Sequence, residues 1–103
     1  TMAKTKKKVI INTAQILETA KLFEILGHDL RLSIILLIQE KQEANVTEIY
    51  TSLNLLQSVT SRHLAVLRKG NLVKYRKEKE MVFYSLNEKL FKQINKAIIE
   101  VKE

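Results

Sequence analysis

Polar and basic residues with a spacing suited to binding a ligand are concentrated between positions 57 and 69 of this 103-residue chain. If residues 58–69 form a helix, Ser58, Ser61 and Arg62 share one face and Gln57 stands at the entry turn. The opposite face then carries the residues that pack inward, Thr60, Leu64 and Leu67. Short hydroxyl side chains let a helix approach a DNA groove closely, and Gln and Arg can each bind a base edge with two hydrogen bonds. The pattern predicts a recognition helix that contacts the major groove through Gln57, Ser58, Ser61 and Arg62, with Val59 and His63 at its margin.

Positive charge is concentrated around and after this segment. The chain has a net charge of +7, and residues 57–79 set the single acid Glu78 against the basic residues Arg62, Arg68, Lys69, Lys74, Arg76, Lys77 and Lys79. Such a local excess is typical of a surface that binds a polyanion. We expect Arg76, Lys77 and Lys79 to hold phosphates or to reach the minor groove of double-stranded DNA. The alternative is a solvated basic face without a ligand.

Other kinds of chemistry have little support in the residues. The chain contains no cysteine, which excludes disulfides, thiolate metal ligands and thiol redox sensing. Its two histidines lack partners at ligand spacing, so no metal and no other cofactor is expected. We expect His28 to cap a helix or lie at the surface, whereas His63 either contacts a backbone phosphate or packs. There is no glycine-rich phosphate loop and no nucleophile beside a base, so the chain is not predicted to be an enzyme.

The elements that must position these side chains are predicted from apolar periodicity and capping residues, with Asn12, Asp29 and Asn45 as N-caps. Helices are expected from the Asn12 cap to about Leu26 and at about 30–39, 46–53, 58–69 and 88–101, with strands at 72–76 and 81–86. Two short helices followed by a basic hairpin, whose charged tip is 77–80, make a mainly α, winged helix-turn-helix fold. Residues 12–103 would form this domain, and residues 1–11 a basic, disordered tail, with a phosphate-seeking arm as the alternative.

Apolar surface on the first and last helices predicts a homodimer. In the first helix Ile16, Ala20 and Phe23 form one stripe, and further apolar residues widen it beyond what one core requires. In the last helix Leu90 and Ile94 begin a second stripe. We therefore expect two copies of the chain to associate through these two helices.

The run 56–68, LQSVTSRHLAVLR, resembles the recognition-helix signature of the ArsR/SmtB family, commonly SQSxVSxHLxxLR. Residues 69–73 resemble the AGLV that follows it, 75–79 resemble the family's wing, and 26–35 resemble its LGDPTRLRIL. The resemblance covers about residues 14–100 and implies a dimeric winged-helix repressor whose first and last helices form the dimer interface. Thr60 stands where the family usually has an inward-facing Val, and Val59 stands where a polar residue is common, for which we expect a local effect only.

The resemblance is weakest at the family's metal sites. Asn45 and Thr47 stand in place of the cysteines of the ELCVC motif, and residues 87–103 contain no histidine. We therefore expect a sequence-specific DNA-binding transcriptional regulator, a repressor that binds an operator as a dimer and senses no metal. The alternative is a winged-helix protein-interaction module without DNA binding. No apolar run is long enough to cross a membrane and no signal-peptide pattern is present, so a cytoplasmic protein is expected.

Overall fold

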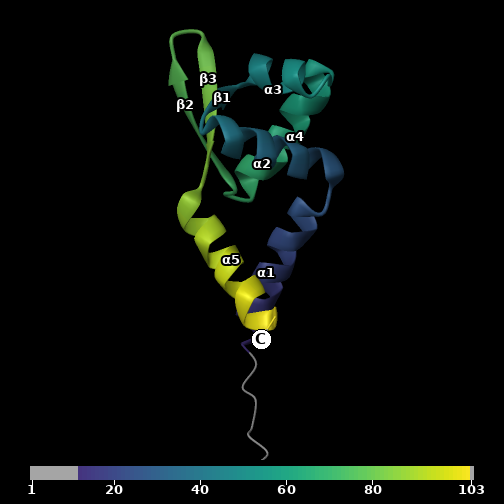
Figure 1. The fold of residues 1–103 in the computed structure, drawn as a ribbon, viewed down its shortest axis with the longest axis vertical. Helices are drawn as coiled ribbons and strands as arrows, with labels where there is room; N and C mark the ends of the chain where they lie inside the picture. Colours follow the sequence, from purple (N-terminus) through teal and green to yellow (C-terminus); the bar gives the residue numbers. More distant parts are fainter. Residues whose placement is uncertain (1–11, 103) are drawn as a thin grey trace, which may run out of the picture.

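The computed structural model describes residues 12–102, so the predicted tail at residues 1–11 lies outside the described residues. Its elements are, in chain order, α1 (Thr13–Leu26), α2 (Asp29–Lys41), β1 (Ala44–Asn45), α3 (Val46–Ser52), α4 (Gln57–Lys69), β2 (Val73–Glu78), β3 (Met81–Leu86) and α5 (Glu88–Lys102). Helices α2, α3 and α4 gather with the sheet into a head, from which α1 and α5 extend on the same side and converge (Figure 1). The predicted mainly α, winged helix-turn-helix fold is confirmed.

The sheet holds one strand that the sequence did not predict. Strand β1 pairs antiparallel with β3, Ala44 opposite Tyr84 and Asn45 opposite Phe83, which gives the strand order β1-β3-β2. Two residues are too few to show an alternating pattern, so only the distant partner strand makes this segment a strand. The hairpin itself is longer than predicted, because β2 continues to Glu78 and pairs with Met81 across a turn of Lys79 and Glu80.

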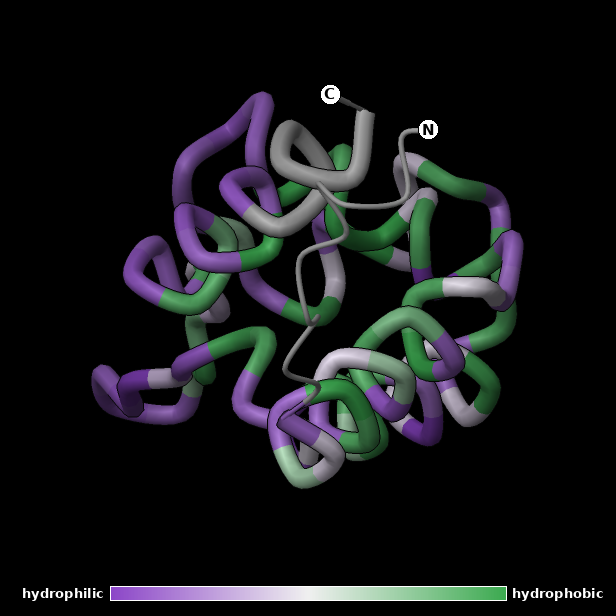
Figure 2. Tube along the Cα trace, turned by 90° about the horizontal axis from the view of Figure 1, so that it is seen from below, coloured by the Kyte–Doolittle hydropathy of each residue, from purple (hydrophilic) through white to green (hydrophobic). Residues whose placement is uncertain are grey.

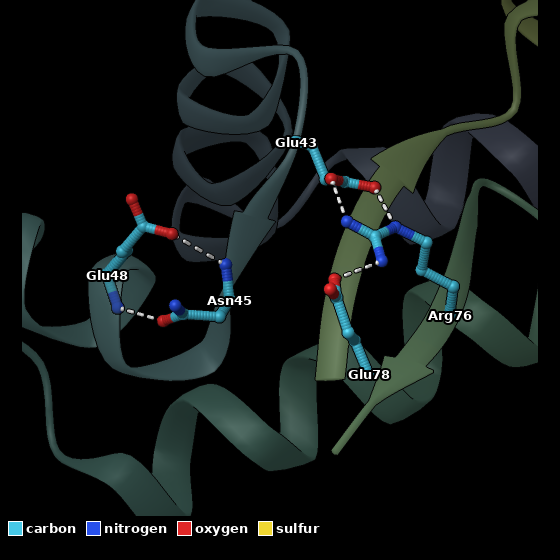
Figure 3. Close-up of polar contacts among 5 residues, drawn as sticks. All are labelled: Glu43, Asn45, Glu48, Arg76 and Glu78. Carbon is cyan, nitrogen blue, oxygen red and sulfur yellow. Dashed lines mark hydrogen bonds and ion pairs between the residues drawn. The ribbon is translucent and has the colours of Figure 1, made fainter. Parts of the chain in front are cut away.

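Helix caps explain most of the helix boundaries. The Asn12 side chain accepts a hydrogen bond from the Gln15 N–H, as predicted for a cap. Asn45 and Glu48 form a capping box that starts α3, with reciprocal backbone-to-side-chain bonds of 2.8 and 3.0 Å (Figure 3). The assignment of Asp29 as the cap of α2 was wrong. His28 is the N-cap and accepts from the Leu30 N–H, whereas Asp29 lies in the first turn, where its charge favours the helix dipole.

The core lies between α2, α3, α4 and the base of the hairpin. Its largest fully buried side chains are Ile34, Ile38, Ile49, Thr60, Leu64, Leu67 and Leu72. Hydrophobic and hydrophilic segments alternate along the helices, as they do where one face packs inward (Figure 2). α2 is central, as its composition predicted, although Leu32 and Leu36 are exposed on its outer side. This core fixes α4 by its inner face and leaves the outer face free.

Candidate nucleic-acid interface

The outer face of α4 carries the side chains that the sequence singled out. Thr60, Leu64 and Leu67 are buried, as their spacing predicted. The exposed residues of this helix include Gln57, Ser58, Ser61, Arg62, Ala65 and Lys69. Val59 and His63 are half-buried at the edges of this face. The structure thus brings Gln57, Ser58, Ser61 and Arg62 together on one short, polar and basic surface.

The N-terminus of α4 has a feature that sequence reasoning missed. Its N-cap is Leu56, which offers no side-chain cap to the N–H groups of the first turn. The Leu56 side chain is 71% exposed directly before Gln57. A leucine at a position where polar caps are preferred was the available signal in the sequence. Leu56 therefore adds an apolar contact point to an otherwise polar surface.

Among the described residues, Thr60 is the one buried side chain with a polar atom that lacks a hydrogen-bond partner. Its Oγ1 has no hydrogen-bond partner among the described residues, and the residue is fully buried. A buried hydroxyl without a partner costs about 1–3 kcal/mol. Thr60 packs inward as predicted, so the exchange with Val59 noted in the sequence has a local cost.

His63 turns toward α2 and the α1–α2 turn. Its Nδ1 accepts a hydrogen bond of 3.3 Å from Arg31 Nε, and Arg31 Nη1 donates to the Ile25 carbonyl at 3.1 Å. The rings of His63 and His28 lie 4.6 Å apart. Partial burial, followed by the positive charge of His28, Arg31 and Arg62, lowers the pKa of His63 below its ordinary 6.5. A neutral His63 thus braces α4 against α2 at neutral pH.

The wing is the hairpin of β2 and β3, and on each of its two faces an arginine stacks on an aromatic ring. On the face toward α4, Arg68 Nη2 donates to the Tyr75 hydroxyl at 3.0 Å, and its Cζ lies 3.9 Å from the ring centre. On the other face, Arg76 Cζ lies 4.6 Å from the ring centre of Phe83. Lys77 and Lys79 are exposed, and Lys79 adopts a φ of 57° at the turn.

Arg76 is engaged by two carboxylates (Figure 3). Its Nε and Nη2 donate to the two carboxylate oxygens of Glu43, both at 2.8 Å, and its Nη1 donates to Glu78 at 2.7 Å. The hydrogen bond from Arg76 lowers the pKa of Glu43, and the two carboxylates raise the pKa of Arg76. Arg76 thus differs from the exposed Lys77 and Lys79, with which it was grouped as a phosphate contact in the sequence analysis, because carboxylates of the chain itself bind its guanidinium group.

Within the part of the chain that the structure describes, no three His, Cys, Asp or Glu side chains gather as they would around a metal ion. No helix among the described residues has the length and apolar character needed to cross a membrane.

Comparison with known proteins places this geometry in a family. The sequence profile of a family described as bacterial regulatory protein, arsR family, matches residues 28–75, from the cap of α2 into β2. The cadmium resistance transcriptional regulatory protein CadC homolog of Staphylococcus aureus is 31% identical over 88 residues, which cover 84% of this chain and 73% of that protein. The chain belongs to the ArsR family. This is a family of DNA-binding transcriptional regulators and not of enzymes, in agreement with the class that the sequence predicted.

Two further ArsR-family comparisons agree. The arsenical resistance operon repressor of Escherichia coli (strain K12) is 42% identical over 67 residues, which cover 65% of this chain and 57% of that protein. The chain thus matches a little over half the length of that relative. The crystal structure of the transcriptional repressor PagR of Bacillus anthracis superposes with a TM-score of 0.70 at 27% identity, covering 89% of this chain and all of that one.

Proposed function

We propose that this ArsR-family chain is a repressor that binds an operator in double-stranded DNA as a homodimer. The observation that carries the proposal is the outer face of α4, which combines short hydroxyl residues with an exposed glutamine and arginine. In each subunit Gln57, Ser58, Ser61 and Arg62 contact the major groove, and Val59 and His63 lie at its edge. Arg62 suits a guanine and Gln57 an adenine, because each can make two hydrogen bonds with that base.

The beginning of α4 supports two additional contacts. The N–H groups of its first turn have no side-chain cap, and such groups bind phosphate oxygens. The exposed Leu56 side chain suits the methyl group of a thymine. Lys77 and Lys79 of the wing then hold flanking phosphates as flexible point charges.

The homodimer rests on apolar surface that a single chain leaves open. No residue of α1 is buried, and Ile16, Leu17 and Phe23 are exposed. A groove of about 660 Å³ lies between α1 and α5, and its lining combines polar side chains with Leu22, Leu90 and Ile94. A second copy of these two helices would cover this surface and place two α4 helices about one DNA turn apart, roughly 34 Å. We propose that such a regulator acts in the cytoplasm.

Selection from a pool of random duplexes, followed by a titration of the recovered duplex, tests the proposal. We expect the recovered duplex to bind about 10³-fold or more tightly than a shuffled duplex of the same composition at physiological salt. Affinity should fall steeply with salt, because phosphate contacts release counterions. Equal affinity for both duplexes would contradict sequence-specific binding and leave only a basic surface.

A further inference from the structure

The side chains around Arg76 form a group that the wing's proposed DNA contacts do not explain. Three of the five guanidinium N–H groups of Arg76 are bonded to Glu43 and Glu78, and the group lies over the Phe83 ring. The contact with Glu43 is bidentate, the geometry that gives an arginine–carboxylate pair its directionality. We call Glu43, Arg76, Glu78 and Phe83 the wing clasp.

The charge of the wing clasp does not favour a phosphate. It contains two carboxylates and one guanidinium, so its net charge is negative. A phosphate oxygen that approached Arg76 would compete with both carboxylates for the same donors and would be repelled by them. Arg76 is therefore a poor phosphate ligand in this arrangement, although its residue type suggested one.

The position of the wing clasp indicates what it does instead. Glu43 lies in the short connection between α2 and β1, whereas Arg76 and Glu78 lie in the outer half of β2. The clasp thus ties the projecting hairpin to the head on one face (Figure 3). On the opposite face Arg68 of α4 holds Tyr75, the residue next to Arg76. The hairpin thus has side-chain contacts to the head on both of its faces.

We propose that Arg76 is a positioning residue of the wing, which Glu43 and Glu78 hold so that Lys77 and Lys79 face the DNA beside α4. The inference rests on the proposed DNA-binding function and revises the role that the sequence gave to Arg76. Lys77 shares the strand face of Tyr75, because alternate residues of β2 point to the same side. A hairpin that could swing would present these lysines at varying distances from the phosphates.

Removal of one carboxylate distinguishes a phosphate-binding Arg76 from a positioning Arg76, because the two roles predict opposite changes in DNA affinity. Glu43→Gln removes one of the two carboxylates that hold Arg76 and leaves Glu78 in place. A phosphate-binding Arg76 would then bind DNA more tightly. The wing clasp predicts instead that affinity for the recovered duplex falls about two- to fivefold, the range expected for one exposed ion pair. Glu80→Gln is the matched control, since no ion pair of Glu80 is found among the described residues, and it should raise affinity slightly.

A charge exchange tests whether the pair, and not Arg76 alone, is required. Glu43→Arg combined with Arg76→Glu keeps the net charge and places an arginine opposite two carboxylates. We expect this double variant to bind DNA within about twofold of the wild type, whereas Arg76→Glu alone binds more weakly. If the exchange fails to restore binding while the fold is intact by thermal unfolding, Arg76 contacts the DNA itself and the inference is wrong.

Amide hydrogen exchange tests the wing clasp without DNA. Glu43→Gln should speed exchange in β2 and β3 near the turn about two- to fivefold, and Glu80→Gln should leave it unchanged. Unchanged exchange in Glu43→Gln would overturn the inference even if the DNA-binding proposal holds. Conversely, a chain that recovers no duplex but shows this exchange pattern would lack the proposed function and still possess the clasp.

Discussion

Single side chains on α4 show how far a periodic pattern predicts burial. The spacing of Thr60, Leu64 and Leu67 identified the inner face correctly, because a helix places residues three and four apart on one side. The same pattern could not show that the Thr60 hydroxyl lacks a partner. That depends on which groups from other elements surround it. The ion pair between Arg76 and Glu43 could not be predicted either, because the two residues are 33 positions apart in the sequence.

Replacement of Thr60 by valine should stabilise the protein. Valine keeps the branched shape and removes the hydroxyl that is buried without a partner. We expect the free energy of unfolding to rise by about 1 kcal/mol, at the lower end of the cost of such a group. Thermal unfolding measures this, and a midpoint several degrees higher is expected for a chain of this size. Thr51→Val, at an exposed position of α3, is the control and should change the midpoint little. A lower midpoint for Thr60→Val would show that the hydroxyl is satisfied.

At the level of elements, the order of helices and strands was predictable, whereas their mutual bracing was not. Apolar periodicity and capping residues gave α1 to α5 and the hairpin within a few residues of their observed ends. Strand β1 escaped prediction because two residues carry no pattern. The sequence could not decide whether His63 packs or contacts a phosphate, because only the folded chain brings Arg31 and His28 to its ring.

The contact between α4 and α2 predicts a pH dependence of stability. The pKa of His63 is lowered in the folded chain, so the unfolded chain binds a proton more readily below pH 6.5. The contribution of neutral His63 is therefore complete above pH 6.5 and declines as the pH falls below that value. His63→Gln should weaken this decline, as measured by thermal unfolding at pH 7.5 and 5.5. His28→Gln is the comparison, and it should weaken the decline less, because His28 is only one of the causes. An identical decline in His63→Gln and the wild type would contradict this account.

At the scale of the whole molecule, α1 carries apolar side chains that one copy of the chain leaves exposed. Helices α1 and α5 project from the head on the same side (Figure 1), and Ile16, Leu17 and Phe23 of α1 are exposed, whereas Ile94 of α5 is buried in the core. The helical spacing of apolar residues in the sequence predicted this excess of apolar surface on α1. Which face a second copy would cover can be inferred only from the structure, in which both helices project from the head.

Substitution of Leu17 tests the dimer directly. Leu17 is 59% exposed on α1, and a glutamate there would place a charge in the proposed interface. We expect the wild type to sediment as a dimer at tens of micromolar and Leu17→Glu to sediment as a monomer. Met81→Glu introduces the same charge at an exposed apolar residue of the wing and should remain dimeric. A monomeric wild type at this concentration would contradict the proposed homodimer.

Base-resolved selection from a random duplex pool tests whether two α4 helices read DNA through Arg62 and its neighbours. We expect the wild type to recover an inverted repeat with half-sites about 10 base pairs apart. Arg62→Ala should lose preference at one base pair in each half-site, at a cost of about 1–3 kcal/mol, while Lys77→Ala keeps the full pattern. A single asymmetric motif would contradict binding as a symmetric dimer, and an unchanged pattern in Arg62→Ala would contradict base recognition by Arg62.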